Sequence, residues 1–242
     1  MTGADVTEPE IVRVADQDGV IDAAAERFAR SVSAAIARRG RARVVLTGGS
    51  AGIGVLTALR SADLDWSAVE FYWGDERFLP AGDAERNEVQ AQEALLAHVP
   101  VDPDKVHRMP SDDGEFAGDV DGAARHYAAI VDPVEEFDVH LLGMGGEGHV
   151  NSIFPHSPAV VEDAATVGPA RAGPTPPPTR ITLTLPMVRR AREVWLLVAG
   201  SGKAEPAAQA LGGAAPADVP SAGATGTERT VWFLDDAAAS QL

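Results

Sequence analysis

The sequence predicts an α/β fold, a largely parallel sheet with helices on both faces. Short apolar segments alternate with longer stretches whose apolar residues recur at helical spacing, and this alternation is typical of parallel strands joined by helices. The composition agrees, because 45% hydrophobic and 23% charged residues are ordinary for a globular chain. We expect a single domain over residues 1–242, because neither an internal repeat nor a linker is visible.

The expected strands are short apolar segments bounded by turn residues. A continuous apolar run indicates a strand buried on both faces, whereas the alternation in Ile181-Thr182-Leu183-Thr184-Leu185 indicates a strand by its period of two. In chain order, the expected strands are 11–15, 44–46, 69–73, 137–142, 181–185, 194–198 and 230–234.

Helices are expected between these strands. Val20, Phe28 and Val32 belong to a set of apolar residues at helical spacing, which predicts a helix over 20–39 with one buried face. The other expected helices are 53–60, 85–97, 120–131, 203–211 and a short one that opens at 235–237. Two stretches rich in Gly, Ala and Pro, 163–179 and 212–226, are expected to be loops.

Charge and composition exclude several classes of function. With 36 acidic and 20 basic residues the net charge is −16, which argues against nucleic acid and anionic membranes as partners. The chain has no cysteine, which excludes disulfides, thiolate zinc sites and a cysteine nucleophile. We see no signal peptide, and no apolar run approaches the ~20 residues that a bilayer requires. We therefore expect a cytoplasmic protein that binds any anionic substrate at a locally positive site.

Polar or glycine-rich segments follow four of the expected strands. They are 47–50, 74–77, 143–149 and 200–203. Because functional sites of open α/β sheets lie beyond the carboxyl ends of the strands, we expect these segments to form one shared site.

Thr47-Gly48-Gly49-Ser50 lies between a strand and a helix. Glycines let the backbone approach an anion, and a helix N-terminus offers unpaired N–H groups. A plain turn with Ser50 as the helix cap is the alternative. Extended to Gly54, the segment also fits the nucleotide loop of short-chain dehydrogenases. Those enzymes need Tyr-x-x-x-Lys, however, and neither tyrosine of this chain is followed by lysine at that spacing.

Residues 143–148 fit the pattern Gly-x-Gly-x-x-Gly after a strand. No acidic residue ends a following strand, so a dinucleotide site is not supported. The loop does present His149 with Glu147 beside it. This pattern is that of a general base with the carboxylate that orients it, although a histidine with a purely structural hydrogen bond is the alternative.

Three cationic residues are candidates for anion binding. Arg77 follows a strand, and its planar guanidinium suits a phosphate or a developing oxyanion as well as a neighbouring carboxylate. Lys203 opens a helix, where a cation is unfavourable against the helix dipole unless an anion binds there. Arg180 precedes a strand, and its role is open. No histidines have the spacing of a metal site, so no metal is expected.

Together these segments resemble the 6-phosphogluconolactonase family, whose relatives include the glucosamine-6-phosphate deaminases. The match spans about 46–236 in the family's order. The matching segments are Leu46-Thr47-Gly48-Gly49-Ser50, Trp73-Gly74-Asp75-Glu76-Arg77-Phe78, 141–155, Arg180-Ile181-Thr182-Leu183-Thr184, Gly200-Ser201-Gly202-Lys203-Ala204 and Trp232-Phe233-Leu234-Asp235.

The resemblance implies hydrolysis of 6-phospho-D-glucono-1,5-lactone in the oxidative pentose phosphate pathway, without a metal or cofactor. It also implies a fold like that of the deaminases and of ribose-5-phosphate isomerases. His149 would be the catalytic base, assisted by Glu147, where the family usually has aspartate, and by Arg77 at the sugar-acid end. The phosphate would be bound by Gly48, Gly49, Ser50, Arg180 and Lys203. We expect this small phosphorylated lactone as the partner and a monomeric chain.

Two other functions stay open at this stage. A deaminase is the first, but deaminases carry Asn-Glu-Pro where this chain has Ile153-Phe154-Pro155, so the carboxylate that they place beside the histidine is absent. A non-catalytic sugar-phosphate sensor is the second. It predicts ligand binding that survives the loss of His149, and no turnover.

Overall fold

The computed structural model describes residues 8–171 and 177–242. Its centre is a six-stranded sheet in the order β1-β9-β8-β5-β2-β3, and every neighbouring pair is parallel. The strands are β1 (Glu10–Val14), β2 (Ala42–Leu46), β3 (Val69–Trp73), β5 (Phe137–Gly143), β8 (Ala191–Val198) and β9 (Arg229–Asp235). The predicted α/β fold class is confirmed.

A second, three-stranded antiparallel sheet accompanies the first. It has the order β4-β7-β6 and consists of β4 (Asp75–Arg77), β7 (Arg180–Leu183) and β6 (Val167–Ala170). Because β4 follows β3 almost directly, the second sheet starts at the carboxyl edge of the first.

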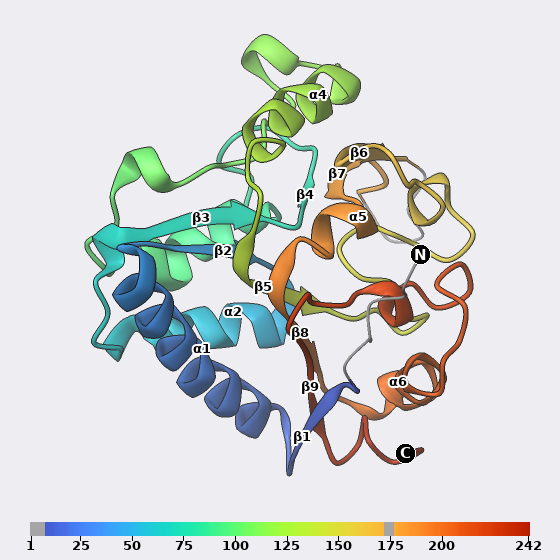
Figure 1. The fold of residues 1–242 in the computed structure, drawn as a ribbon. Coiled ribbons are helices and arrows are strands. Elements are labelled where there is room, and N and C mark those ends of the chain that lie inside the picture. Colours follow the sequence, from blue (N-terminus) through green and yellow to red (C-terminus); the bar gives the residue numbers. More distant parts are fainter. Residues whose placement is uncertain (1–7, 172–176) are drawn as a thin grey trace.

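The helices are α1 (Gln17–Arg39), α2 (Gly49–Ala58), α3 (Asn87–Ala91), α4 (Val120–Val131), α5 (Leu185–Val188) and α6 (Ala204–Leu211). A π-helical stretch, Gln92–Leu96, continues α3. Figure 1 shows α1 and α2 on one side of the large sheet, and α4, α5 and the small sheet on the other. None of the helices in the described ranges is long and apolar enough to cross a bilayer.

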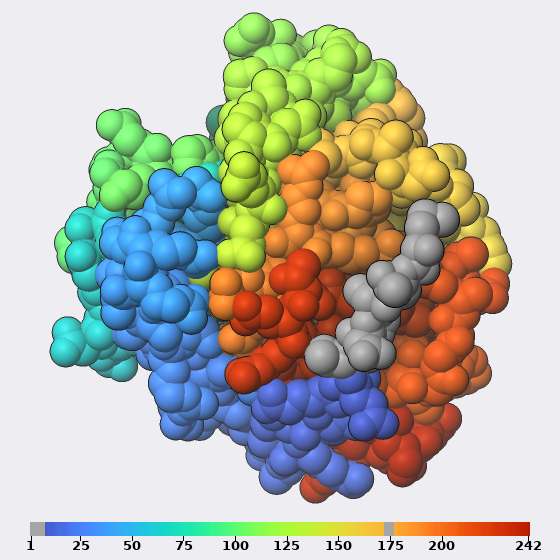
Figure 2. All heavy atoms as spheres, viewed as in Figure 1, coloured from blue at the N-terminus to red at the C-terminus, as the bar shows by residue number. Residues whose placement is uncertain are grey.

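Helix α1 begins and ends where local chemistry dictates. The Asp16 side chain accepts a hydrogen bond of 2.9 Å from the Gly19 N–H, which satisfies one donor of the first turn. Gly40 adopts a left-handed φ of 71° and donates its N–H to the Ile36 carbonyl. The first and last strands of the described chain are neighbours in the sheet, since β1 pairs with β9. Figure 2 shows that the dark blue segment at the start of the described chain lies near red segments from the C-terminal part of the chain.

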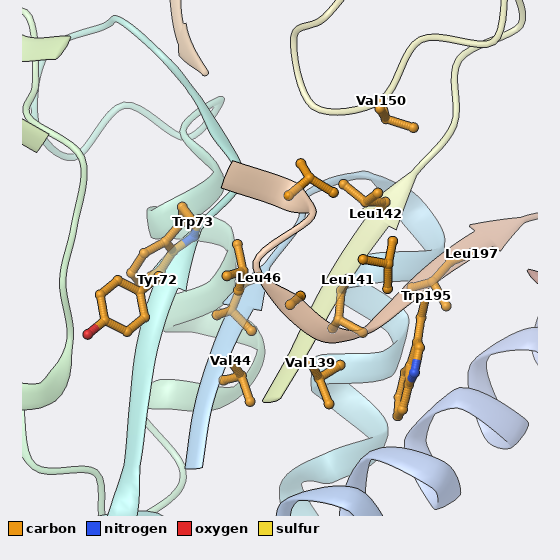
Figure 3. Packing of buried hydrophobic residues seen from close by; sticks show 14 of the residues in the cluster. Val44, Leu46, Tyr72, Trp73, Val139, Leu141, Leu142, Val150, Trp195 and Leu197 are labelled. Carbon is orange, nitrogen blue, oxygen red and sulfur yellow. The ribbon is translucent and has the colours of Figure 1, made fainter. Parts of the chain in front are cut away.

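The core lies where the central strands bury both faces. Figure 3 shows side chains from β2, β3, β5 and β8 packed together, among them Leu46, Trp73, Leu141 and Trp195, each at most 1% exposed. A sheet covered on both faces explains why these strands are nearly continuous apolar runs in the sequence.

Tyr127 connects α4 to the end of β3. Its phenol oxygen accepts a hydrogen bond of 3.0 Å from the Trp73 N–H and lies 3.3 Å from the Trp73 carbonyl, in a fully buried position. Tyr127→Phe would leave that N–H buried without an acceptor. We expect a loss of about 1–3 kcal/mol in the free energy of unfolding, measured by urea denaturation. An unchanged unfolding midpoint would contradict this role.

The strand order reverses between β2 and β5. From β2 the chain moves outward to β3, returns to β5 on the other side of β2, and continues outward to β8 and β9. The connections that leave β2 and β5 therefore diverge, and they leave a crevice beyond the carboxyl ends of these two strands.

Several predicted elements differ from the structure. The loop predicted over 163–179 contains β6, although residues 172–176 of that range lie outside the described part. The strand predicted over 181–185 ends at Leu183, because Leu185 opens α5. The helix predicted over 53–60 begins earlier, at Gly49, because α2 packs along α1 despite its glycines. The final helix predicted at 235–237 is wrong.

The segment after β9 forms only turns. The Asp235 carboxylate accepts from the Ala238 N–H at 2.7 Å, as a helix cap would, but it also accepts from the Gly200 N–H. Asp235 thus ties the end of β9 to the turn after β8 instead of opening a helix.

Candidate active site

A cavity of about 220 Å³ lies at this reversal of strand order. The segments that follow β2, β3, β5 and β8 all contribute to it, which confirms the expectation that these four strand ends converge. It is lined by Thr47, Gly48, Gly49, Asp75, Arg77, Asn87, Gly143, Met144, Gly145, His149, Asn151, Arg180 and Lys203.

Most of the residues expected at the site line this cavity, and two do not. Ser50 lines a neighbouring cavity of about 170 Å³ together with Gly48, Gly49 and Lys203. Its hydroxyl is exposed and donates to Oε1 of Gln17 at 3.1 Å. Glu147 does not line the main cavity and instead contacts His149.

His149 lies on a tight loop after β5. The Gly145 N–H donates to the His149 carbonyl at 2.9 Å, and the Gly148 N–H donates to the Gly145 carbonyl at 3.1 Å. Nδ1 of His149 lies 3.1 Å from Oε1 of Glu147, without the alignment of a full hydrogen bond. The imidazole ring also packs against Phe154, with ring centroids 4.6 Å apart. The ring is thus held on two sides.

Glu147 is kept as a carboxylate. Partial burial would raise its pKa, but its own backbone N–H, His149 and Lys203 outweigh that effect and lower the pKa below its ordinary value. An ionised carboxylate beside Nδ1 favours a proton on that nitrogen.

Gly145 makes room for the His149 ring. A Cβ at position 145 would lie 1.9 Å from Nδ1 of His149. Gly145→Ala should therefore displace the imidazole and lower the turnover number roughly a hundredfold, because misplacement of a reacting group by about 1 Å has effects of this size. Gly146→Ala is the matched control, since its Cβ would come no closer than 3.6 Å to the Gly202 carbonyl oxygen. Equal activities of the two variants would contradict this role.

Arg77 and Arg180 form one wall of the cavity. They are directly opposite each other in the antiparallel pairing of β4 with β7. Like charges placed opposite each other destabilise a sheet. An anion bound between the two guanidinium groups would relieve this repulsion, so the pair is suited to a phosphate or a carboxylate.

The surroundings of Arg180 are also consistent with a bound anion. Its side chain is 7% exposed, Nη1 lies 4.0 Å from Oδ2 of Asp75, and the guanidinium carbon lies 5.9 Å from the centre of the Phe154 ring. Burial lowers the pKa of Arg180, with Asp75 opposing and Arg77 adding to that shift. Phe154 therefore contacts both the cationic wall and the His149 ring.

Hydrogen bonds from the chain itself hold this wall. Nη1 of Arg77 donates to Oδ1 of Asn87, and the Asn87 amide donates to the Asp75 carbonyl at 2.9 Å and to the Asp75 carboxylate at 3.2 Å. The Ser152 hydroxyl donates to the other oxygen of Asp75 at 2.6 Å. Asp75 therefore connects β4 with the loop after His149.

Glu76 fixes β4 from behind. Its fully buried carboxylate accepts from the backbone N–H groups of Arg77, Asn87 and Glu88 at 2.7–2.9 Å. Burial raises the pKa of Glu76 to about 7, although Arg86 and these N–H groups oppose the shift. Its role is to set the backbone from which Arg77 and Asn87 project.

Lys203 lies on the opposite side of the carboxyl edge, in the turn between β8 and α6. Burial lowers the pKa of its ammonium group, and Glu147 opposes that shift. With Gly48 and Gly49 nearby, Lys203 adds a third positive charge to a chain whose net charge is −16. The cavity is thus a locally positive site in an acidic protein, as predicted.

Sequence reasoning missed His140 and Asn151. His140 is fully buried on β5, and Asn151, 7% exposed, lines the cavity with a left-handed φ of 49°. The side-chain polar atoms of both residues are buried without an aligned hydrogen bond in the described structure. His140 lies within an apolar strand sequence, and Asn151, two residues after His149, has no sequence signal of its own.

His140 should make the protein sensitive to acid. Burial lowers the pKa of His140 to about 3 from an ordinary 6.5, with the nearby Asn151 opposing. The folded state therefore binds fewer protons than the unfolded state, and stability present above pH 6.5 is lost as the pH falls toward 3. From about pH 7 to about pH 5.5, wild type should lose about 1 kcal/mol more unfolding free energy than His140→Leu. Parallel pH dependences in urea denaturation would contradict this.

The described residues also enclose a larger cavity, of about 430 Å³, at the opposite edge of the sheet. Four of its arginines are paired with acidic neighbours, for example Arg27 with Glu10 at 2.6 Å and with Glu193 at 3.3 Å. The smaller cavity is therefore the better candidate for a site, because it combines a histidine, clustered cations and the reversal of strand order. No set of three or more acidic or histidine side chains in the described ranges gathers as a metal site.

The chain is an α/β protein, and its cavity at the carboxyl edge of a parallel sheet is suited to a small anionic ligand. A family model described as glucosamine-6-phosphate isomerases/6-phosphogluconolactonase matches residues 15–232. The chain belongs to this family. A 6-phosphogluconolactonase of Mycobacterium tuberculosis is 50% identical over 236 residues, which cover 94% of this chain and 96% of the relative.

Two solved structures are similar to the fold. One is a 6-phosphogluconolactonase from Trypanosoma brucei, with a TM-score of 0.85, 25% identity, and coverage of 97% of this chain and 98% of the other. The other is a monomeric glucosamine-6-phosphate deaminase, with a TM-score of 0.81, 19% identity, and coverage of 96% and 100%. The fold is therefore common to both activities, and only the residues of the site can separate them.

Proposed function

We propose that the chain hydrolyses 6-phospho-D-glucono-1,5-lactone to 6-phospho-D-gluconate, with His149 as the general base. The name of the 50% identical relative supports the activity. The proposal depends above all on His149, which contacts Glu147 and lines a cavity together with Arg77, Arg180 and Lys203. The pair suits proton transfer, and the three cations suit a phosphorylated substrate.

His149 would activate water through Nε2. Because Nδ1 faces Glu147, Nε2 is the nitrogen left for a water molecule. His149 takes the proton as the water oxygen attacks the C1 carbonyl, and it returns the proton to the ring oxygen as the C1–O5 bond breaks. Glu147 stabilises the imidazolium that exists between these two steps.

The cations would orient the lactone and stabilise charge. Lys203 and the backbone at Gly48 and Gly49 are available to the phosphate, and Ser50 borders the same region. Arg180 was expected at the phosphate and Arg77 at the sugar-acid end, yet the two residues share one wall. We propose that this wall holds the phosphate through Arg180, while Arg77 reaches toward the developing oxyanion at C1.

Phe154 argues against a deaminase. It occupies the position where deaminases carry a glutamate, and its ring packs 4.6 Å from the His149 ring. An apolar ring at this place offers no carboxylate for ring opening or for proton transfer to an amine. The site therefore favours hydrolysis of a lactone, which needs one base and one oxyanion donor.

Turnover of three compounds tests the proposal. We expect rapid hydrolysis of 6-phosphogluconolactone, after subtraction of its spontaneous opening. Gluconolactone without the phosphate should have a kcat/KM that is lower by roughly a hundredfold or more, because the cations then have no partner. Glucosamine 6-phosphate should release no ammonia. Ammonia release would favour the deaminase, and binding of the phosphorylated lactone without turnover would favour a sensor.

A further inference from the structure

The amide of Asn151 is a buried polar group that the mechanism above does not use. It lines the cavity beside His149, and both Nδ2 and Oδ1 are buried without an aligned hydrogen bond. Unpaired buried polar atoms are costly, and in native proteins they are usually satisfied by a ligand, water or a protein group. Because Asn151 lines the cavity, an amide in this state is suited to a polar group of the substrate.

The amide does not stand alone, because His140 lies behind it. A Cβ on Gly74 would lie 2.3 Å from Oδ1 of Asn151 and 3.0 Å from Nε2 of His140, so the two side chains converge on the same side of Gly74. The glycine is required for this arrangement. His140 stays neutral because burial lowers its pKa to about 3, and a neutral imidazole offers one donor and one acceptor.

The Asn151 amide offers the same two functions. A carboxamide can donate through Nδ2 and accept through Oδ1 at once, and each hydroxyl of a sugar can accept and donate. The lactone carries neighbouring hydroxyls at C2, C3 and C4. None of the cationic residues above selects for them, since charges recognise the phosphate and the oxyanion.

We propose that Asn151 recognises the ring hydroxyls of the lactone and that His140 is the positioning residue that holds its amide. Asn151 lies two residues after His149, has a left-handed backbone with φ of 49°, and lines the cavity. The inference rests on the proposed function and adds the element that distinguishes one sugar lactone from another.

A cycle of variants and substrates tests this proposal. Wild type, Asn151→Ala and Asn151→Asp are assayed with 6-phosphogluconolactone and its 2-deoxy, 3-deoxy and 4-deoxy analogues. We expect Asn151→Ala to lower kcat/KM for the full lactone roughly tenfold to a hundredfold. It should lower kcat/KM much less for at least one deoxy analogue, which already lacks the contact. Asn151→Asp, which keeps the size and the acceptor, should retain part of the discrimination.

His140 is tested by rescue. His140→Leu should raise the KM for the lactone several-fold with a smaller change in kcat, and His140→Gln, which restores a donor and an acceptor, should recover most of the loss. Ser221→Ala is the matched control, because the Ser221 hydroxyl is also buried without a partner but does not line the cavity. It should change stability alone.

Each outcome separates the two proposals. If wild type hydrolyses the lactone and Asn151→Ala discriminates among the deoxy analogues as wild type does, the role of Asn151 is overturned while the proposed function stands. If His140→Leu leaves KM unchanged, the positioning role of His140 is overturned. If wild type does not hydrolyse the lactone at all, the proposed function fails and this inference fails with it.

Discussion

The His149→Ala variant should hydrolyse 6-phosphogluconolactone at least a hundred times more slowly than wild type. General-base catalysis by a positioned histidine contributes roughly 10²–10⁴-fold to a rate. KM should change little, because the cations that bind the phosphate are untouched. The measurement is kcat and KM at neutral pH, with the spontaneous opening of the lactone subtracted from both enzymes.

His156→Ala is the control for this experiment. His156 also stands next to an acidic residue, Asp218 at 3.6 Å, but its side chain is 73% exposed and it lies outside the cavity. Its replacement should leave kcat unchanged. If His149→Ala were as active as His156→Ala, the lactonase activity would stand but His149 could not be its base.

Replacement of Arg180 by alanine should have the largest effect on binding. Truncation of one partner in a buried charged contact weakens binding by amounts that correspond to roughly a hundredfold in KM. Stability should fall as well, by about 1–3 kcal/mol, because Asp75 loses a cation at 4.0 Å, although it keeps its hydrogen bonds from Ser152 and Asn87.

The matched control for Arg180 removes the same charge elsewhere. Arg30 lies on the surface of α1 with a side chain that is 62% exposed. Arg30→Ala should leave KM and kcat as in wild type. The inhibition constant of inorganic phosphate gives a second measurement, and it should weaken in Arg180→Ala alone. Equal phosphate inhibition of the two variants would show that the anion binds elsewhere.

Much of the large sheet could be predicted from sequence because its strands are buried on both faces. Val44, Val45 and Leu46 of β2 are all fully buried, and such apolar runs indicate strands without knowledge of their partners. The small sheet lacked this signal. Asp75, Glu76 and Arg77 form β4 only because β7 pairs with them, and charged residues in sequence do not indicate a strand.

Strand β6 escaped prediction for a different reason. It contains Gly168 and Pro169, residues that favour a loop in a sequence analysis. Because β6 is an edge strand that pairs only with β7 among the described residues, one side of its backbone needs no partner in the sheet and proline is tolerated. The tertiary position of the segment, which sequence does not state, decides its conformation.

The candidate site likewise has one part that the sequence predicts and another that only the tertiary structure determines. The glycine-rich loop, His149 and Lys203 lie at strand ends. Their proximity can therefore be predicted from sequence, because sites in parallel sheets lie beyond the carboxyl ends of the strands. The opposition of Arg77 and Arg180 depends on the register of β4 and β7, and the meeting of His140 with Asn151 depends on the space left at Gly74. Neither arrangement can be derived from spacing along the chain.

Hydrolysis of a phosphorylated lactone with His149 as the base can be tested in a single assay. It follows the time course of 6-phosphogluconate formation from 6-phosphogluconolactone, coupled to 6-phosphogluconate dehydrogenase, for wild type and His149→Ala in parallel. We predict a wild-type rate that is proportional to enzyme concentration, saturates with substrate, and falls at least a hundredfold in the variant. A wild-type rate no faster than the spontaneous opening of the lactone would contradict the proposed lactonase activity.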